Sequence, residues 1–277
     1  MLRIFDDRRR ELVFAHPPRR IVSLVPSETQ NLVALGARSR LIGRTVWCED
    51  APEAATVGGT KDVDVAAVLR LDPDLILANQ EENSRVHLEE LARRGLPLFI
   101  SFPRTVADGI AHLARLARIL GVDARDLVRR GYAASAPSAR VRPLRTFVPI
   151  WMDPLMTVHA QTFVSDALRL AGGDNVFGDR ERRYPLAADL GEAIPGPAGT
   201  RDTRYPRVTL DEVRARDPEL VLLPDEPHPF SEADAGIFRK ALPAARVAFC
   251  KGKDLMWPGV QSIEGLPRLR AVLEVLA

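Results

Sequence analysis

Two stretches of the chain share one pattern of apolar and polar positions. Each begins with apolar residues at helical spacing, passes through Asp-Pro, and ends in a short apolar run followed by polar residues: VDVAAVLRLDPDLILANQE at 63–81 and VTLDEVRARDPELVLLPDE at 208–226. Proline disfavours a helical conformation in the preceding residue, and a fully apolar run is typical of a strand buried in a parallel sheet. The repeat predicts two similar lobes, although this order of elements could also recur as ordinary α/β punctuation.

The remaining hydrophobic pattern fills out both lobes. Residues 2–5 and 11–14 alternate around a polar turn and predict a hairpin. Apolar runs predict strands at 21–24, 41–43, 98–100, 145–150 and 247–249, and helical spacing predicts helices at 27–35, 84–94, 106–120, 162–170 and 262–276, with one more after Ser231. We expect an N-terminal α/β lobe at 1–121, a connecting helix at 122–142, and a C-terminal α/β lobe at 143–277 with an inserted loop of low regularity at 176–207. Ser27 is expected to cap its helix.

Polar residues follow the two repeated strands. Asn79 and Glu81 follow the first strand and Glu226 follows the second. Because ligands of open α/β sheets bind beyond the carboxyl ends of the strands, these side chains are expected to face one opening, a cleft between the lobes. Carboxylates there could do acid/base work, but no nucleophile or base is indicated beside them, so hydrogen bonds to a ligand are the simpler role.

Three tryptophans occur in predicted loops that follow strands: Trp47, Trp151 and Trp257. The loop that carries Trp47, at 44–61, is long for a compact lobe, which favours a functional role. Large rings at a cleft would suit a broad flat ligand, and Met156 joins the ligand-binding set after Trp151. The alternative is that the rings plug the ends of the lobes as core residues.

Other candidate ligand groups lie in loops. Arg104 could meet a carboxylate or phosphate, and His228 and His159 could reach the cleft as hydrogen-bonding groups, with His159 also a possible metal ligand. Each could equally be a solvated loop residue without a ligand. The histidines on amphipathic helices, His87 and His112, are expected at the surface or at its boundary.

Composition and missing motifs exclude several functions. The 277 residues carry 39 basic and 37 acidic side chains with no basic tract, which argues against nucleic acid. Glycine-rich nucleotide loops, GxSxG and HExxH are absent, which lowers the expectation of an enzyme. Cys48 and Cys250 lack metal-site spacing; free thiols are favoured over one disulfide between lobes. No signal-peptide pattern or membrane span is present, so a native Met1 predicts a cytoplasmic protein, and a removed leader would make it periplasmic.

Several short stretches are informative together: RIVSLVPSET at 20–29, LG at 35–36, LIG at 41–43, DPDLIL at 72–77, GLPL at 95–98 and AGGDNVF at 171–177. In combination they resemble the helical-backbone metal receptor family, the substrate-binding proteins of cobalamin, haem and ferric-siderophore ABC transporters. The resemblance covers almost the whole chain and is closest to the cobalamin-binding branch. It implies two Rossmann-like lobes, each with a mostly parallel sheet, joined by one long helix, and a ligand bound without catalysis. Trp47 stands where cobalamin-binding relatives have an aromatic residue. Thr60 and Asn79 stand where those relatives have other aromatic contacts.

The resemblance also bears on partners. Transporter-coupled relatives carry a glutamate on each lobe that docks on permease arginines, and the matching positions here are Ala66 and Asp211. One docking carboxylate is therefore absent, and the chain reads as a family member that has left transport and binds its ligand in the cytoplasm. If transport persists, an ABC permease should bind, with Asp211 as the remaining contact.

The sequence therefore predicts a non-catalytic binding protein for a metal chelate. A corrinoid such as cobalamin is the first expectation, and haem or a ferric siderophore comes next. Two alternatives stay open: a cytoplasmic enzyme that acts on a corrinoid or tetrapyrrole with cleft carboxylates, and a protein-interaction module. The sequence leaves the metal, the oligomeric state and the role of the 176–207 insertion undetermined.

Overall fold

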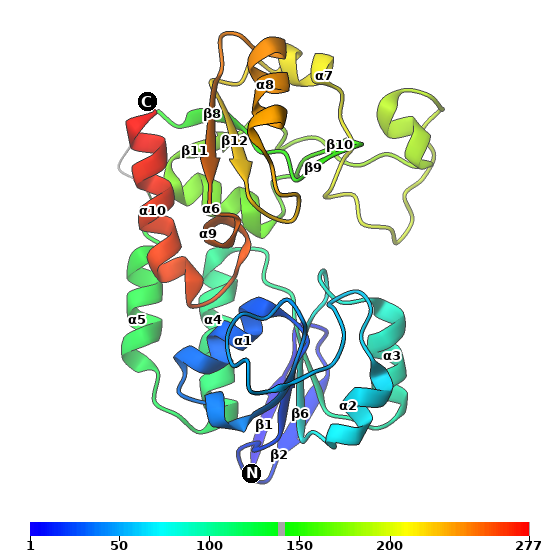
Figure 1. Cartoon of the computed structure of the whole chain (residues 1–277), viewed down its shortest axis with the longest axis vertical. Coiled ribbons are helices and arrows are strands. Elements are labelled where there is room, and N and C mark those ends of the chain that lie inside the picture. Colours follow the sequence, from blue (N-terminus) through cyan, green and yellow to red (C-terminus); the bar gives the residue numbers. More distant parts are fainter. Residues whose placement is uncertain (138–141, 277) are drawn as a thin grey trace. The chain divides into compact units, whose positions relative to one another are not determined.

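The computed structural model describes residues 1–137 and 142–276, which form two compact units (Figure 1). The first unit holds Met1–Pro103, Ala107–Tyr132 and Pro258–Gln261; the second holds Arg104–Val106, Ala133–Trp257 and Ser262–Ala277. The assignment to units changes inside α5 (Arg125–Ala134) and after the first residue of α4 (Val106–Leu120) and of α10 (Gln261–Val275). The two α/β units expected from the repeat are confirmed. The numbered boundaries at 121 and 142 stay a prediction, and 138–141, at the end of the expected connecting helix, lie outside the described residues.

The first unit is built on a five-stranded parallel sheet in the order β5-β4-β3-β6-β7. Its strands are β3 (Ile21–Ser23), β4 (Leu41–Arg44), β5 (Ala55–Thr56), β6 (Leu75–Asn79) and β7 (Leu98–Ser101). Its helices are α1 (Pro26–Ala34), the 3-10 turn η1 (Arg38–Arg40), α2 (Val65–Leu71), α3 (Arg85–Arg93) and α4 (Val106–Leu120), followed by α5. The hairpin β1 (Leu2–Phe5) and β2 (Glu11–Phe14) is antiparallel, as expected.

Helices cover both faces of this sheet, and the strands are apolar on both faces for that reason. Leu75 and Leu77 of β6 pack on one face with residues of α1, α4 and the hairpin. Ile76 and Ala78 pack on the other face with residues of α2 and α3. Figure 1 shows α1 and α4 on one side of the sheet and α2 and α3 on the other. This alternation explains the unbroken apolar run in the sequence.

The second unit contains a four-stranded parallel sheet in the order β11-β8-β12-β13. Its strands are β8 (Leu144–Phe147), β11 (Gly173–Asn175), β12 (Leu220–Pro224) and β13 (Arg246–Cys250), and a small antiparallel pair is formed by β9 (Trp151–Met152) and β10 (Leu155–Met156). Its helices are α6 (Phe163–Ala171), the 3-10 helix η2 (Leu186–Leu190), α7 (Leu210–Ala215), α8 (Glu232–Ala241), α9 (Gly252–Met256) and α10 (Gln261–Val275). The strand order matches that of the first unit, with β11, β8, β12 and β13 in the places of β4, β3, β6 and β7.

The repeat extends to hydrogen bonds that the sequence did not reveal. In the first unit Arg20 donates to the carbonyl oxygens of Leu71 and Asp72 at the end of α2. In the second unit Arg145 donates to the carbonyl oxygens of Arg216 and Asp217, the two residues directly after α7. These side chains satisfy carbonyl groups that a helix end leaves without partners. We call each arrangement an arginine clamp.

Each clamp is completed at the start of the central strand. The Asp74 carboxylate accepts from the backbone nitrogens of Arg19 and Arg20, and the Glu219 carboxylate accepts from the backbone nitrogen of Arg145. The residue before each proline, Asp72 or Asp217, has a positive φ of 44° or 47°. The Asp-Pro pairs thus end their helices as predicted, and the clamp fixes the turn that follows.

Several local predictions were wrong in detail. Ser27 does not cap its helix, because α1 begins at Pro26 after Val25 and Ser27 is buried inside it. Trp151 begins the strand β9 instead of lying in a loop. Trp257 directly follows the short helix α9, and this helix was not predicted. Cys48 and Cys250 are free thiols, as favoured. No helix among the described residues is long and apolar enough to cross a membrane.

Candidate functional sites

The strand order of each sheet marks where a ligand site is expected. In the first unit the chain moves from β3 to β4 on one side and later to β6 on the other, so the order reverses between β3 and β6. In the second unit it reverses between β8 and β12. Ligands of open α/β sheets bind beyond the carboxyl ends of the strands at such a reversal. A ligand site is therefore expected at the loops after β3 and β6 in the first unit, and at the loops after β8 and β12 in the second.

In the first unit Trp47 is exposed on a tight turn. Trp47 is 66% exposed, while hydrogen bonds fix the backbone around it. The backbone nitrogen of Cys48 donates to the carbonyl oxygen of Thr45, and the backbone nitrogen of Val46 donates to the carbonyl oxygen of Gly58. The Arg44 guanidinium donates to three carbonyl oxygens of this loop. A large ring held out on a rigid turn loses little conformational entropy when a ligand covers it.

Two glycines let this turn close. Gly58 has a φ of 86°, and a Cβ there would lie 2.4 Å from the carbonyl oxygen of Asp62. A Cβ on Gly59 would lie 2.2 Å from the Asp62 carboxylate and 3.1 Å from the Trp47 ring nitrogen. Gly58 is therefore required by close backbone approach and a positive φ, whereas a side chain at Gly59 would displace the Asp62 carboxylate, and the indole ring lies beside the Gly59 backbone.

Asn79 and Asn83 hold the neighbouring loops together. The Asn83 amide donates to the carbonyl oxygens of Leu24 and Thr60, which belong to the segments after β3 and β5. The Asn79 amide donates to Ser101 and accepts from the backbone nitrogens of Glu81 and Glu82. Asn79 is only 6% exposed, so its side chain serves the loop. Glu81 is half-buried, and Lys61 donates to its carbonyl oxygen.

In the second unit Trp151 and His228 lie together. Trp151 follows β8 and His228 follows β12, the two strands at which the order reverses. Their ring centroids are 5.6 Å apart in an edge-to-face arrangement, and His228 meets the buried Phe230 ring at 4.6 Å. The indole nitrogen of Trp151 donates to the carbonyl oxygen of Asp153. The exposed Trp151 ring thus packs against His228, which packs in turn against the buried ring of Phe230.

The other predicted contacts of the second unit are less exposed. Met156 pairs with Trp151 across the β9-β10 ladder and is half-buried. A Cβ on Gly252 would lie 2.3 Å from the Glu226 side chain, so α9 begins packed against Glu226. Trp257 is half-buried, with the Lys253 ammonium 4.8 Å from its ring centroid.

Arg104 and His159 are placed in loops. Arg104 is exposed, two residues before α4. The Nδ1 atom of His159 accepts from the backbone nitrogen of Gln161, which leaves the proton of a neutral ring on Nε2. Metal ligation by His159 stays a prediction. Across residues 1–137 and 142–276, no group of three or more His, Cys, Asp and Glu side chains is arranged to hold a metal ion.

The two predicted docking positions are equivalent in the structure. Ala66 and Asp211 are each the second residue of their helix, α2 or α7, and both are exposed. Asp211 forms an ion pair with Arg214. Whether a permease binds there stays a prediction.

A buried set in the first unit resembles a hydrolase triad by composition. Glu28 accepts from Ser101 at 2.6 Å and contacts the Nε2 atom of His112 at 2.8 Å, and none of the three is more than 2% exposed. A hydrolytic serine must hydrogen bond to its histidine and reach substrate, whereas Ser101 donates to the carboxylate and is covered. The set is a core network, and the prediction that His112 lies at the surface was wrong because α4 packs its His112 face onto the sheet.

The Glu28 carboxylate should make unfolding pH-dependent. Burial raises the pKa of Glu28, but the charge of His112 and hydrogen bonds from His112, Ser101 and Asn31 outweigh it and hold the pKa below its ordinary 4.5. A carboxyl group whose pKa is lower in the folded than in the unfolded protein stabilises the fold above its unfolded pKa. This stabilisation is lost as the pH falls through the folded pKa. We expect Glu28→Gln to lower the unfolding free energy by about 2 kcal/mol at neutral pH, and the difference to shrink below about pH 4.5.

Urea unfolding of both proteins between about pH 3 and pH 7 measures this difference. The control is Glu89→Gln on the exposed face of α3, where the ion pair with Arg85 lies in solvent and a much smaller change is expected. A Glu28→Gln difference that stayed constant from neutral to acid pH would contradict the assignment.

The comparisons with known proteins agree with this fold. The vitamin B12-binding protein of Pectobacterium atrosepticum is 29% identical over 226 residues, which covers 72% of this chain and 81% of that protein. The periplasmic vitamin B12 binding protein BtuF of Vibrio cholerae superposes with a TM-score of 0.73 at 20% identity, covering 94% of this chain and 98% of that one. The periplasmic haem-binding protein RhuT of Roseiflexus sp. RS-1 gives 0.69 at 19% identity, with 93% and 98% covered. No protein-family model matches the sequence.

The matching α/β units with their parallel sheets have the class III binding-protein fold. The chain is similar to class III periplasmic binding proteins, and the relatives reported above are named as vitamin B12-binding and haem-binding proteins. Those relatives are binding proteins and not enzymes, in agreement with the prediction from the sequence. The solved relatives are named as periplasmic, and the cytoplasmic location expected for this chain stays a prediction.

Proposed function

We propose that this protein binds a metal chelate without transforming it, with a corrinoid of the vitamin B12 type as the first candidate and haem as the second. The observation that carries the proposal is the 29% identity to a vitamin B12-binding protein over most of both chains. The haem candidate rests on the shared fold, because the haem-binding structure is only 19% identical.

The exposed aromatic residues support a ligand with broad flat faces. Trp47 stands on a fixed turn after β4, the neighbour of β3 in the first sheet, and Trp151 begins β9 after β8 in the second unit, so each lies beyond the carboxyl end of a parallel strand. Aromatic rings give a large contact area at a small entropic cost, and a corrin or porphyrin offers the matching apolar surface. We assign ligand contact to these two residues and to His228, with Met156, Glu81, Arg104, Glu226 and Trp257 as further contacts.

Visible absorption titration of the purified protein tests the proposal. Hydroxocobalamin, haemin and a ferric siderophore are titrated separately, because the spectrum of each changes when its metal or ring environment changes. We expect saturable binding of hydroxocobalamin at one equivalent, and saturation by haemin alone would move the assignment to haem. Saturation by none of the three would overturn the proposal and favour the protein-interaction alternative. Turnover of a bound chelate into a new species would favour the enzyme.

A further inference from the structure

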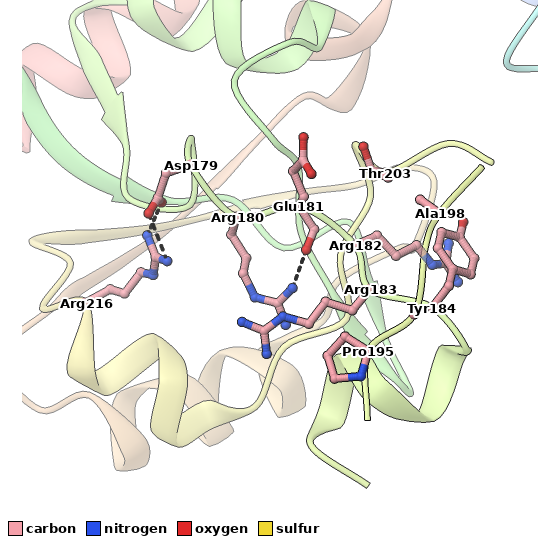
Figure 2. Close-up of a pocket in the computed structure, with 11 residues that line it drawn as sticks. Asp179, Arg180, Glu181, Arg182, Arg183, Tyr184, Pro195, Ala198, Thr203 and Arg216 are labelled. Carbon is pink, nitrogen blue, oxygen red and sulfur yellow. Dashed lines mark hydrogen bonds and ion pairs between the residues drawn. The ribbon is translucent and has the colours of Figure 1, made fainter. Parts of the chain in front are cut away.

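The 176–207 segment of the second unit contains a pocket whose charged walls are matched from within. The pocket has a volume of about 490 Å³, and Figure 2 shows the Arg216–Asp179 ion pair at one side of it. Arg180, another lining residue, contacts the buried carboxylate of Asp189 at 3.1 Å. These ion pairs fix a segment that the sequence analysis expected to be a loop of low regularity, and the charges that form them are spent on the walls.

Unmatched polar groups occur in the first unit, where the turn that carries Trp47 meets a second turn at residues 59–62. Trp47 follows β4, and the 59–62 turn follows β5, the parallel neighbour of β4. Both turns therefore lie beyond the carboxyl ends of adjacent strands, the edge at which open α/β sheets bind ligands. The backbone nitrogen of Gly59 donates to the carbonyl oxygen of Asp62 at 3.3 Å, so the second turn is closed and its side chains stand on a defined backbone.

Gly59 brings the Trp47 indole nitrogen and the Asp62 carboxylate to the same place. A Cβ on Gly59 would lie 2.2 Å from Oδ1 of Asp62 and 3.1 Å from Nε1 of Trp47, so the two groups flank one point beside the Gly59 backbone. Both residues are exposed, and within residues 1–137 and 142–276 neither the indole N–H nor the carboxylate has a hydrogen-bond or ion-pair partner. One free donor and one free acceptor thus lie side by side.

A donor beside an acceptor matches a primary carboxamide group. The carbonyl oxygen of the amide can accept from the Trp47 indole N–H while its NH₂ group donates to the Asp62 carboxylate, a charge-assisted hydrogen bond. A ligand carboxylate offers only acceptors, so it would find no donor at Asp62 and would be repelled by the like charge. The rim of a corrin ring of the vitamin B12 type carries acetamide and propionamide groups, whereas the rim of haem carries propionates.

We propose that Trp47 and Asp62 bind a primary carboxamide on the rim of the ligand, and that Asp62 makes the site select an amide-bearing corrinoid over a carboxylate-bearing tetrapyrrole. This selectivity rests on the proposed function and deepens it, because it assigns the choice between the two candidate chelates to one side chain. Asp62 was not among the predicted site residues, since its place beside Trp47 depends on the close approach of two turns at Gly59.

Two corrinoids with the same ring and the same metal separate amide recognition from carboxylate recognition. Dicyanocobinamide carries amides on its rim, and dicyanocobyrinic acid carries carboxylates. In equilibrium dialysis of the full chain near neutral pH, read by the corrin absorption, we expect the native protein to bind the cobinamide at least about tenfold more tightly. Asp62→Asn should reduce this preference by about tenfold, because its amide can donate to a ligand carboxylate.

The matched control is Asp126→Asn on α5, which removes the same charge from an exposed ion pair with Arg129 and should keep the native preference. Trp47→Phe keeps an aromatic ring without the N–H and should weaken cobinamide binding by about threefold or more. The Asp62 side chain has no partner to lose, so the melting temperature of Asp62→Asn should equal that of the native protein.

Equal preferences of the native protein, Asp62→Asn and Asp126→Asn would overturn the carboxamide pair and leave corrinoid binding in place. A native protein that bound the cobyrinic acid as tightly as the cobinamide, or that bound haemin and neither corrinoid, would overturn it as well. Retention of none of these chelates would overturn the proposed function together with the selectivity.

Discussion

Replacing Asp189 with alanine is expected to destabilise the second unit by about 3–5 kcal/mol, the usual cost of removing one partner of a buried ion pair. The carboxylate is fully buried and accepts from Arg180 and from the backbone nitrogens of Arg183 and Arg207. Without it, these donors lose an acceptor that water cannot replace. The 176–207 segment should open first, because these bonds join its middle to its end.

Urea unfolding measures the total loss, and hydrogen exchange of the Arg183 and Arg207 amides measures the local one. Both amides should lose protection in the variant even under conditions in which the β12 amides stay protected. The matched control is Asp202→Ala in the same segment, where the carboxylate is 44% exposed and pairs with Arg204. There we expect a loss below about 1 kcal/mol. Equal losses for the two alanine variants would contradict the structural role given to Asp189.

Trp47→Ala is expected to weaken binding of the chelate that saturates the native protein by about 2 kcal/mol, or about thirtyfold in Kd. The indole is exposed, while Arg44, Gly58 and Gly59 fix the turn on which it stands. The variant removes contact area from a site that is already preorganised, so the loss should appear in affinity and leave the stability of the unit nearly unchanged.

The matched control in the same unit is Phe5→Ala, which removes another exposed aromatic ring, 55% exposed on the hairpin. We expect it to bind like the native protein in the absorption titration. In the second unit Trp151→Ala has Phe249→Ala as its control, since Phe249 on β13 is 39% exposed. If the Trp47→Ala variant bound with native affinity, the turn that carries Trp47 would not belong to the binding site, whatever the other variants showed.

The repeated pattern was sufficient to predict the α/β units, because apolar runs, Asp-Pro and helix-ending glycines each act locally. The hairpin strands begin and end at the predicted residues, and β6 and β12 lie on the apolar runs that follow Asp-Pro. The strand pairs that were missed, such as β9 with β10, have only two residues each and no periodicity of their own. The short helix α9 is defined by its packing against Glu226, which lies far away in sequence.

The candidate sites were predicted only in part, since they depend on contacts between distant residues. Trp47 and Trp151 were found because an aromatic ring after a strand is visible in one sequence. Whether Asn79 faces a ligand or holds a loop depends on Ser101 and on backbone nitrogens that no local pattern identifies. The Glu28–His112 network was missed for the same reason, because each residue alone is an ordinary polar position on a helix.

The arginine clamps have a further consequence for how this architecture acquires new parts. The bond from Arg20 to Asp72 spans 52 residues, and its counterpart from Arg145 to Asp217 spans 72. Both clamps have the same form, although the second encloses the 176–207 segment and its pocket. The clamp ties the start of one strand to the end of the helix that leads into its neighbour, so it holds the sheet in register whatever the length of chain in between. The chain between the clamped elements can therefore differ in length between the two units without a change in the sheet that carries it.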